Sequence, residues 1–247
     1  MAAPVFVFDI ETIPDLAAMR RVLGDLAAED EAVLAAYDDK VKPALQQVVA
    51  IAGAWISPVG ELVRLRALGT PTASERELVE EFFTVVTRHQ PRLAGWNTRG
   101  FDLPVLIYRA MVHHIATPRF YAVGEPWRGY RYRYDEEGHI DLMDLLANYG
   151  ASTWLRLHEM AAVLGIPGKS GVDGSQVWDL YRAGRLDVIR SYCEADVLTT
   201  ALIYGRYAEH RGWFSEAQAA SFAASVRRFL DGVSGEQWDA FRKWVGQ

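Results

Sequence analysis

The pattern of apolar residues predicts a set of short strands. Residues 4–9 form an apolar run rich in β-branched and aromatic side chains, which is typical of a buried strand. Runs of this kind occur five times, at residues 4–9, 47–56, 61–68, 93–96 and 139–141. The stretch 57–60, with its proline and glycine, joins the second run to the third and predicts a hairpin.

A spacing of three or four residues between apolar positions predicts helices after the hairpin. One helix begins at Ser74, which forms a capping box with Glu77. A second amphipathic segment follows Asp102, and that aspartate fits an N-cap. Residues 185–204 predict a third helix. A hairpin followed by alternating strands and helices indicates an α/β fold with a mixed sheet.

Two segments lie outside this alternation. Residues 15–37 form an acidic, helix-prone insertion, and residues 213–247 predict two helices broken at 231–235. The second segment has exposed-looking aromatic residues, namely Phe222, Phe229, Trp238, Phe241 and Trp244. We expect residues 211–247 to be a helical extension docked on the rest of the chain, and self-association through these helices is the alternative.

Four carboxylates stand at the ends or on one face of the predicted elements. Asp9 and Glu11 are two residues apart at the end of the first strand, so they point to the same face. Asp102 lies at a strand-to-helix corner, while Tyr192 and Asp196 share a helix face at i and i+4. Each of these stretches alone is a weak signal, because surface acids and a helix cap explain them equally well.

Together these carboxylates point to a metal site. Carboxylates gathered in a buried place repel one another, so metal ions or protons must neutralise them. Oxygen ligands suit hard divalent cations such as Mg²⁺, which makes a divalent-cation site the best explanation of such a cluster.

Composition limits the class of protein. The 247 residues, half of them hydrophobic, are enough for one large domain, and no apolar run approaches the length of a membrane span. The chain begins without the basic and apolar regions of a secretory signal. The single cysteine, Cys193, excludes an internal disulfide framework, and we therefore expect a cytoplasmic protein.

The net charge of −6 argues at first against a nucleic-acid ligand. Four of the negative charges are the candidate metal ligands, and bound divalent cations would reverse the local field. The charge is also uneven, because eight arginines and only two acidic residues lie between positions 88 and 133. A positive stretch therefore exists within an acidic protein.

Residues 119–134 interleave aromatic rings with arginines, among them Arg128 and Arg131. Rings that stack on bases and guanidinium groups that meet phosphates suit a single strand. A loop whose aromatics pack on the core explains the pattern equally well. The glycine-rich stretch 168–175 offers Lys169 as a further contact, although its spacing is not that of a Walker A loop and a plain connector is the alternative.

Three motifs in this order resemble those of the DEDD superfamily of DnaQ-like 3′–5′ exonucleases. The motifs are Asp9-Ile-Glu11, Trp96-Asn97-Thr-Arg-Gly-Phe101-Asp102 and Tyr192-Cys-Glu-Ala-Asp196. The Tyr-x-x-x-Asp form of the last is that of the DEDDy subgroup. The chain resembles most closely the predicted exonucleases similar to the proofreading domain of family-B DNA polymerases, from about residue 5 to about residue 208. This resemblance implies a ribonuclease H-like fold, with a five-stranded mixed sheet flanked by helices.

The resemblance also implies roles for individual residues. Two Mg²⁺ or Mn²⁺ ions, about 3.5–4 Å apart, would be held by the four carboxylates, with Asp9 bridging both. Tyr192 would orient the attacking water, because a phenol with a pKa of about 10 is a poor general base at neutral pH. The candidate metal ligands are Asp9, Glu11, Asp102 and Asp196. The candidates for substrate binding are Thr12, Trp96, Asn97, Phe101, Arg128, Arg131 and Lys169.

We therefore expect residues 1–210 to form a stand-alone 3′–5′ exonuclease domain. Its substrate would be the 3′ end of single-stranded nucleic acid, with DNA favoured over RNA. A catalytically inactive module that binds 3′ ends is the alternative, although such a module would have no need of a repulsive acidic cluster. A metal-binding scaffold that acts through its C-terminal helices is a third hypothesis.

Overall fold

A computed structural model describes residues 3–37, 41–125, 127–168 and 174–246. Five strands form one sheet in the order β3-β2-β1-β4-β5. They are β1 (Val5–Pro14), β2 (Gln46–Ile56), β3 (Leu62–Ala67), β4 (Arg92–Gly95) and β5 (His139–Asp141). Only β2 runs against the others, because β1 and β3 pair with it in antiparallel fashion while β1, β4 and β5 pair in parallel. The predicted mixed sheet of a ribonuclease H-like fold is confirmed.

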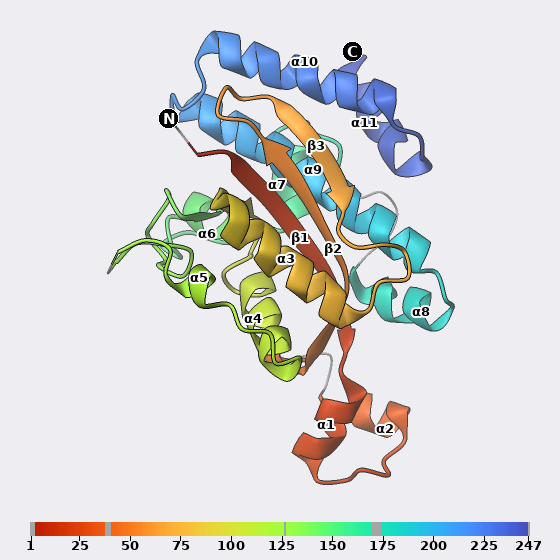
Figure 1. The fold of residues 1–247 in the computed structure, drawn as a ribbon. Helices are drawn as coiled ribbons and strands as arrows, with labels where there is room; N and C mark the ends of the chain where they lie inside the picture. The colour runs from red at the N-terminus through yellow and green to blue at the C-terminus, as the bar shows by residue number, and fades with distance from the viewer. Residues whose placement is uncertain (1–2, 38–40, 126, 169–173, 247) are drawn as a thin grey trace.

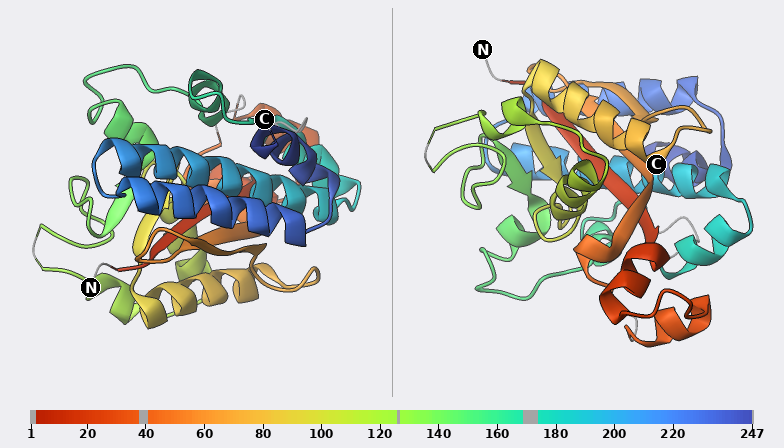
Figure 2. Two further views of the ribbon diagram at one scale, coloured as in Figure 1. Left: turned by 90° about the horizontal axis from the view of Figure 1, so that it is seen from above. Right: turned by 60° about the horizontal axis from the view of Figure 1, so that its bottom comes forward.

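Helices cover both faces of the sheet. The longer ones are α3 (Glu75–His89), α4 (Asp102–Val112), α9 (Leu186–His210) and α10 (Glu216–Gly232). The shorter ones are α1 (Leu16–Leu23), α2 (Asp30–Ala35), α5 (Pro118–Tyr121), α6 (Leu142–Leu146), α7 (Leu157–Val163), α8 (Val177–Arg182) and α11 (Asp239–Val245), with 3₁₀ turns η1 (Pro43–Leu45), η2 (Gly174–Gln176) and η3 (Glu236–Trp238). The sheet lies between α3 on one face and α9 with α10 on the other (Figures 1 and 2). No helix among the described residues is long and apolar enough to cross a membrane.

The alternation of side chains along β1 builds two cores. Phe6 and Phe8 pack with α3 and α4, whereas Val5 and Val7 join the core beneath α9. Side chains two residues apart on a strand share a face. The acidic residues at odd positions of β1 therefore point toward α9.

The first strand is longer than its apolar run predicts. It continues through Pro14, so Asp9 and Glu11 lie within the strand and not at its end. The polar end is paired because β2 lies beside it, with Glu11 opposite Ala50 and Thr12 opposite Val48. Val49 has no partner in this register, which makes it a β-bulge.

The hairpin of β2 and β3 and the capping box at Ser74 agree with prediction, since the Ser74 side chain accepts from the amide of Glu77. The N-cap prediction for Asp102 is wrong. Phe101 occupies the cap position, and Asp102 is the first helical residue of α4. The carboxylate of Asp102 instead accepts a hydrogen bond from β1, and this long-range contact has no local sequence signal.

The C-terminal helices pack on β3 and α9, and α10 runs beside α9 (Figure 2). A Cβ atom at Gly205 would lie 2.4 Å from the ring of Phe222, so only glycine allows this approach. Ser225 on α10 accepts a hydrogen bond of 2.8 Å from the amide of Leu62. The rings of Phe222, Trp238 and Phe241 are buried, in contrast to their exposed appearance in the sequence.

The acidic insertion forms α1 and α2, which project beyond the end of the sheet (Figure 1). It has a small core of its own, made by Met19, Val33 and Leu45. Asp15 caps α1 by accepting from the amide of Ala18 at 2.9 Å. The insertion is therefore a small helical unit that follows directly on the end of β1.

Candidate active site

The β1 strand presents two carboxylates to α9. Glu11 is buried and Asp9 is half-buried, and their oxygens approach within 4.8 Å of one another. Their partners across the sheet are Ala52 and Ala50. These small side chains let α9 approach the sheet and leave room around the carboxylates.

Asp102 reaches the same place from α4. Its Oδ1 accepts a hydrogen bond of 3.2 Å from the amide of Ile10, the residue between Asp9 and Glu11. The side chain is only 3 % exposed. The corner after β4 thus places the third carboxylate directly beside the first two.

The α9 helix supplies the last two predicted residues. Tyr192 and Asp196 are half-buried, and the phenol lies close enough to the Asp196 carboxylate for that charge to act on it. Cys193, on the same turn, is buried with its Sγ 3.4 Å from the carbonyl oxygen of Asp9 and 3.6 Å from its Oδ2. The thiol therefore joins the helix to β1 from beneath the carboxylates.

Burial and mutual repulsion act on these acids together. Burial is the largest cause that raises the pKa of Asp9, and the charges of Asp102, Glu11 and Asp196 raise it further. Burial, then Asp196 and Asp102, raise the pKa of Glu11. Burial raises the pKa of Asp102 to about 8. Four carboxylates thus lie close enough to disfavour one another's charge.

The pKa of Tyr192 is also raised above its ordinary value. Burial is the main cause, followed by the negative charge of Asp196 and then that of Glu11. The phenol therefore stays protonated at neutral pH and acts as a hydrogen-bond donor. Among the described residues, no cationic side chain forms an ion pair with Asp9, Glu11 or Asp102.

Two side chains of α9 set its position against the sheet. Glu194 accepts a hydrogen bond of 2.8 Å from the amide of Ala67. Arg190 donates to the carbonyl oxygens of Leu68 at 2.9 Å and Gly69 at 3.0 Å. Glu194 therefore binds the backbone of β3 and is not one of the clustered carboxylates, although it lies between Tyr192 and Asp196 in the sequence.

The turn after β4 is held by Asp141 at the end of β5. Its carboxylate accepts from the amides of Asn97 and Arg99, both at 2.9 Å. Asn97 has a left-handed φ of 59°. Gly95 allows the turn to lie close, because a Cβ there would be 2.2 Å from Thr98. Asp141, at the end of β5, thus supports the turn that leads to Asp102.

The other candidates for substrate binding differ in exposure. Thr12 is half-buried beside Glu11, and Phe101 is half-buried against the core under α3 and α4. Trp96 is only 9 % exposed, and its indole donates to the carbonyl oxygen of Leu155 at 3.2 Å. Lys169 lies outside the described residues.

The aromatic and arginine-rich stretch divides between core and surface. Phe120 and Tyr130 are buried, whereas Trp127 is 78 % exposed. Arg131 is exposed over the ring of Tyr121, and Arg128 is exposed on the same loop. Part of this stretch therefore packs on the core, while Trp127, Arg128 and Arg131 are exposed.

Several arginines of the basic stretch are neutralised by acids outside it. Arg133 makes two contacts of 2.7 Å with Asp144, and Arg92 pairs with Glu137. The charge surplus counted along the sequence is therefore smaller on the surface of the molecule.

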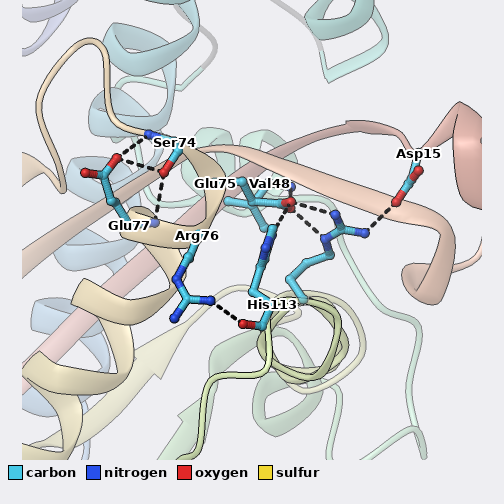
Figure 3. Close-up of polar contacts among 8 residues, drawn as sticks. Asp15, Val48, Ser74, Glu75, Arg76, Glu77 and His113 are labelled. Atoms are coloured by element: carbon cyan, nitrogen blue, oxygen red, sulfur yellow. Dashed lines mark hydrogen bonds and ion pairs between the residues drawn. The ribbon is translucent and has the colours of Figure 1, made fainter.

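A buried ion network near the end of β1 has no counterpart in the predictions (Figure 3). Arg109 of α4 is 4 % exposed and donates to Glu75 at 2.6 and 2.7 Å and to Asp15 at 2.6 Å. Glu75 also accepts from the amide of Val48 at 2.6 Å and contacts His113 at 2.7 Å. This network joins α1, α3, α4 and the bulge in β2, so it fixes α4 relative to the strand that carries the acids.

A comparison with solved structures finds a family-B DNA polymerase and exonuclease I. The family-B DNA polymerase of the archaeon Pyrobaculum calidifontis is 19 % identical with a TM-score of 0.48, over 85 % of this chain and 24 % of the polymerase. A product-bound exonuclease I is 12 % identical with a TM-score of 0.46, over 85 % of this chain and 44 % of the other. E. coli exonuclease I in complex with a 5cy-dT13 oligonucleotide is 13 % identical with a TM-score of 0.41, over 95 % of this chain and 46 % of the other. The chain spans less than half the length of each of these proteins.

None of the curated proteins matches the chain. One family model matches residues 38–245, and its description is a predicted 3′–5′ exonuclease related to the exonuclease domain of PolB. The matched range includes Asp102, Tyr192 and Asp196 and begins after Asp9 and Glu11. The family match therefore does not cover Asp9 and Glu11, and their place in the site is known only from the position of β1 in the structure.

Proposed function

We propose that this chain, which belongs to the family of predicted 3′–5′ exonucleases related to the exonuclease domain of PolB, is a metal-dependent enzyme that hydrolyses terminal phosphodiesters of single-stranded nucleic acid. One observation carries the proposal. Four carboxylates from β1, α4 and α9 meet at one place beside Tyr192, without an ion pair from the described cationic side chains to the three on β1 and α4. DNA is the favoured substrate, with RNA as the second candidate.

The donor set fits divalent cations. Asp9, Glu11, Asp102 and Asp196 offer only oxygen atoms, which Mg²⁺ and Mn²⁺ prefer. The pKa values of Asp9, Glu11 and Asp102 are raised, so the protein keeps these groups protonated when no cation neutralises them. Bound cations would take over this neutralisation. Two such ions, when bound, would stabilise charge on the attacking and leaving oxygens of the phosphodiester.

Tyr192 takes the role of a positioning donor in this proposal. Its hydroxyl lies beside the Asp196 carboxylate, and its raised pKa keeps the proton in place. A protonated phenol orients a water molecule but does not abstract its proton. The carboxylates that would hold the metal ions are kept in place separately, because the amide of Ile10 on β1 donates a hydrogen bond to Asp102.

The residues around the carboxylates are proposed to hold the end of the strand. Thr12, Asn97 and Phe101 lie in segments that carry the acids, and Trp96 acts by holding the turn after β4. Arg128 and Arg131 are proposed phosphate contacts farther away. We also propose residues 1–210 as the exonuclease domain and residues 211–247 as its helical extension, in which self-association remains the alternative role.

A cytoplasmic location is proposed from the sequence, and the unpaired, buried thiol of Cys193 fits it. The function is tested with single-stranded oligonucleotides labelled at either end and incubated with Mn²⁺ or with EDTA. We expect a 5′-labelled strand to give a ladder of shortened products and a 3′ label to be released in the first step, both only with metal. Internal cuts, or binding without any hydrolysis, would favour another nuclease type or a module that only binds 3′ ends.

A further inference from the structure

A groove of about 810 Å³ lies next to the segment that carries Asp102. Asn97, Gly100 and Leu103 form its near end, and Tyr108 of α4 lines it farther along the helix. This volume is within the range of about 300–1,000 Å³ that is typical of ligand sites. The groove is thus continuous with the turn between β4 and α4 at the candidate active site.

Trp154 stands on the wall of this groove with 53 % of its surface exposed. The carboxylate of Asp144, which Arg133 holds through two contacts of 2.7 Å, also lines the groove. Arg133 is the main cause that lowers the pKa of Asp144, and the nearby indole of Trp154 lowers it further. A Cβ at Gly150 would lie 3.1 Å from Cζ2 of Trp154, so the ring packs directly on this glycine. Large exposed rings with one open face and a fixed position are typical of binding surfaces.

The other groups of the groove match a nucleic-acid strand. Tyr108 is 41 % exposed and supplies a second ring. Arg131 lines the groove over the ring of Tyr121 at 5.2 Å, and no acidic side chain of the described residues forms an ion pair with it. Rings that stack on bases, next to a guanidinium group that meets phosphate, form the pattern by which proteins bind single strands without reading sequence.

We infer that this groove binds the nucleotides that precede the 3′ terminus of a single strand, with Trp154 as a stacking platform and Arg131 as a phosphate contact. The direction of the strand rests on the proposed function, because the 3′ end must reach the carboxylates. Bases paired in a duplex do not offer their faces to Trp154. The groove therefore gives the site its preference for single strands and for substrates of several nucleotides.

Binding to the Asp9→Asn protein in Mg²⁺ tests this inference without hydrolysis. Fluorescence anisotropy with a labelled single-stranded 12-mer should show that Trp154→Ala weakens binding by roughly 5- to 150-fold, the range for one stacked base. Trp154→Phe should recover most of the affinity. Tyr108→Ala is an independent variant on a different element and should also weaken binding.

Trp127→Ala is the matched control, since Trp127 is more exposed than Trp154 but does not line the groove. Its affinity for the 12-mer should equal that of the parent protein. Equal affinities for the Trp154→Ala, Tyr108→Ala and Trp127→Ala proteins would overturn the inference.

A one-nucleotide substrate separates the groove from the reaction. On an otherwise unchanged chain, Trp154→Ala should hydrolyse the p-nitrophenyl ester of thymidine 5′-monophosphate at the same rate as the parent, because this compound is too short to reach the platform. A parent protein that hydrolyses neither this ester nor an oligonucleotide would contradict the proposed function. The 12-mer binding comparison would still decide whether the groove binds a single strand.

Discussion

The amide of Ile10 donates a hydrogen bond of 3.2 Å to Oδ1 of Asp102, across 92 positions of sequence. Ile10 lies between the two acids of β1, so this contact brings the carboxylate of α4 to their side. The contact of Cys193 with Asp9 does the same for α9. Two hydrogen bonds to the backbone of β1 thus bring together acids from three distant segments. They explain how carboxylates that repel one another are held in one place.

Stability of the metal-free protein should fall as the pH rises from 6.5 to 8.5. The pKa of Asp102 is raised to about 8 by burial, so the folded state holds this proton more tightly than the unfolded state. Its contribution is complete below pH ~4, the ordinary range of an aspartate, and is lost as the pH rises through about 8. Thermal unfolding in EDTA measures the trend. Asp102→Asn should make it less steep, while Asp9 and Glu11, whose pKa values are also raised, still contribute to it.

Added Mn²⁺ should reverse this trend, because the cation binds the deprotonated carboxylates. The increase in melting temperature should be larger at pH 8 than at pH 6.5. If the melting temperature of the metal-free Asp102→Asn protein fell with pH as steeply as that of the parent, Asp102 would not be one of the titrating groups.

Tyr192→Phe should lower kcat by about a hundredfold while Mn²⁺ binding stays close to that of the parent. The proposed role of the hydroxyl beside Asp196 is to orient a reactant, so its loss should affect the reaction more than metal binding. Asp196→Asn is the comparison, and it should lower kcat and also weaken Mn²⁺ binding. Hydrolysis rates together with calorimetric Mn²⁺ titrations separate the two effects. Equal loss of metal binding in both variants would assign Tyr192 to the metal site.

Arg131→Ala should reduce the salt dependence of oligonucleotide binding more than Arg128→Ala. Arg131 lines the groove, whereas Arg128 is exposed outside it. One lost phosphate contact lowers the slope of log K against log salt by about 1. The slopes come from binding constants measured at several KCl concentrations between roughly 50 and 300 mM. An unchanged slope in both variants would favour a purely structural loop.

Arg109→Ala should destabilise the protein by about 3–5 kcal/mol, because it leaves two buried carboxylates without their partner. Arg76→Ala is the control, since Arg76 makes an exposed contact with the carbonyl oxygen of His113 in the same region (Figure 3). Urea denaturation gives both values. A change below about 1 kcal/mol for Arg109→Ala would mean that the network does not hold α4 in place.

The sequence predicts the local features of this protein better than its long-range contacts. Strand runs, the hairpin and the capping box at Ser74 depend on neighbouring residues, and the structure contains all of them. The course of β1 past Glu11 and the place of Asp102 within α4 depend on partners far along the chain. Propensity therefore identified the elements but not where these two segments end or begin.

The candidate site shows the same division. The three motifs predict Asp9, Glu11, Asp102, Tyr192 and Asp196 as site residues, and the fold brings these five residues together. The sequence does not predict a role for Trp154, because this single tryptophan lies outside every periodic pattern of apolar residues. Its importance follows only from the groove and from its contact with Asp144.

The most direct measurement is the rate of 3′ shortening of a 5′-labelled single strand, across a Mn²⁺ titration, for a series of neutralised acids. Asp9→Asn, Glu11→Gln, Asp102→Asn and Asp196→Asn should each lose at least about a hundredfold in rate at every metal concentration. Glu194→Gln is the matched control, since its carboxylate is turned to the amide of Ala67 and glutamine can still accept that bond. It should shorten the strand at the parental rate. Full activity in any of the four neutralised variants would contradict a catalytic site built from these carboxylates.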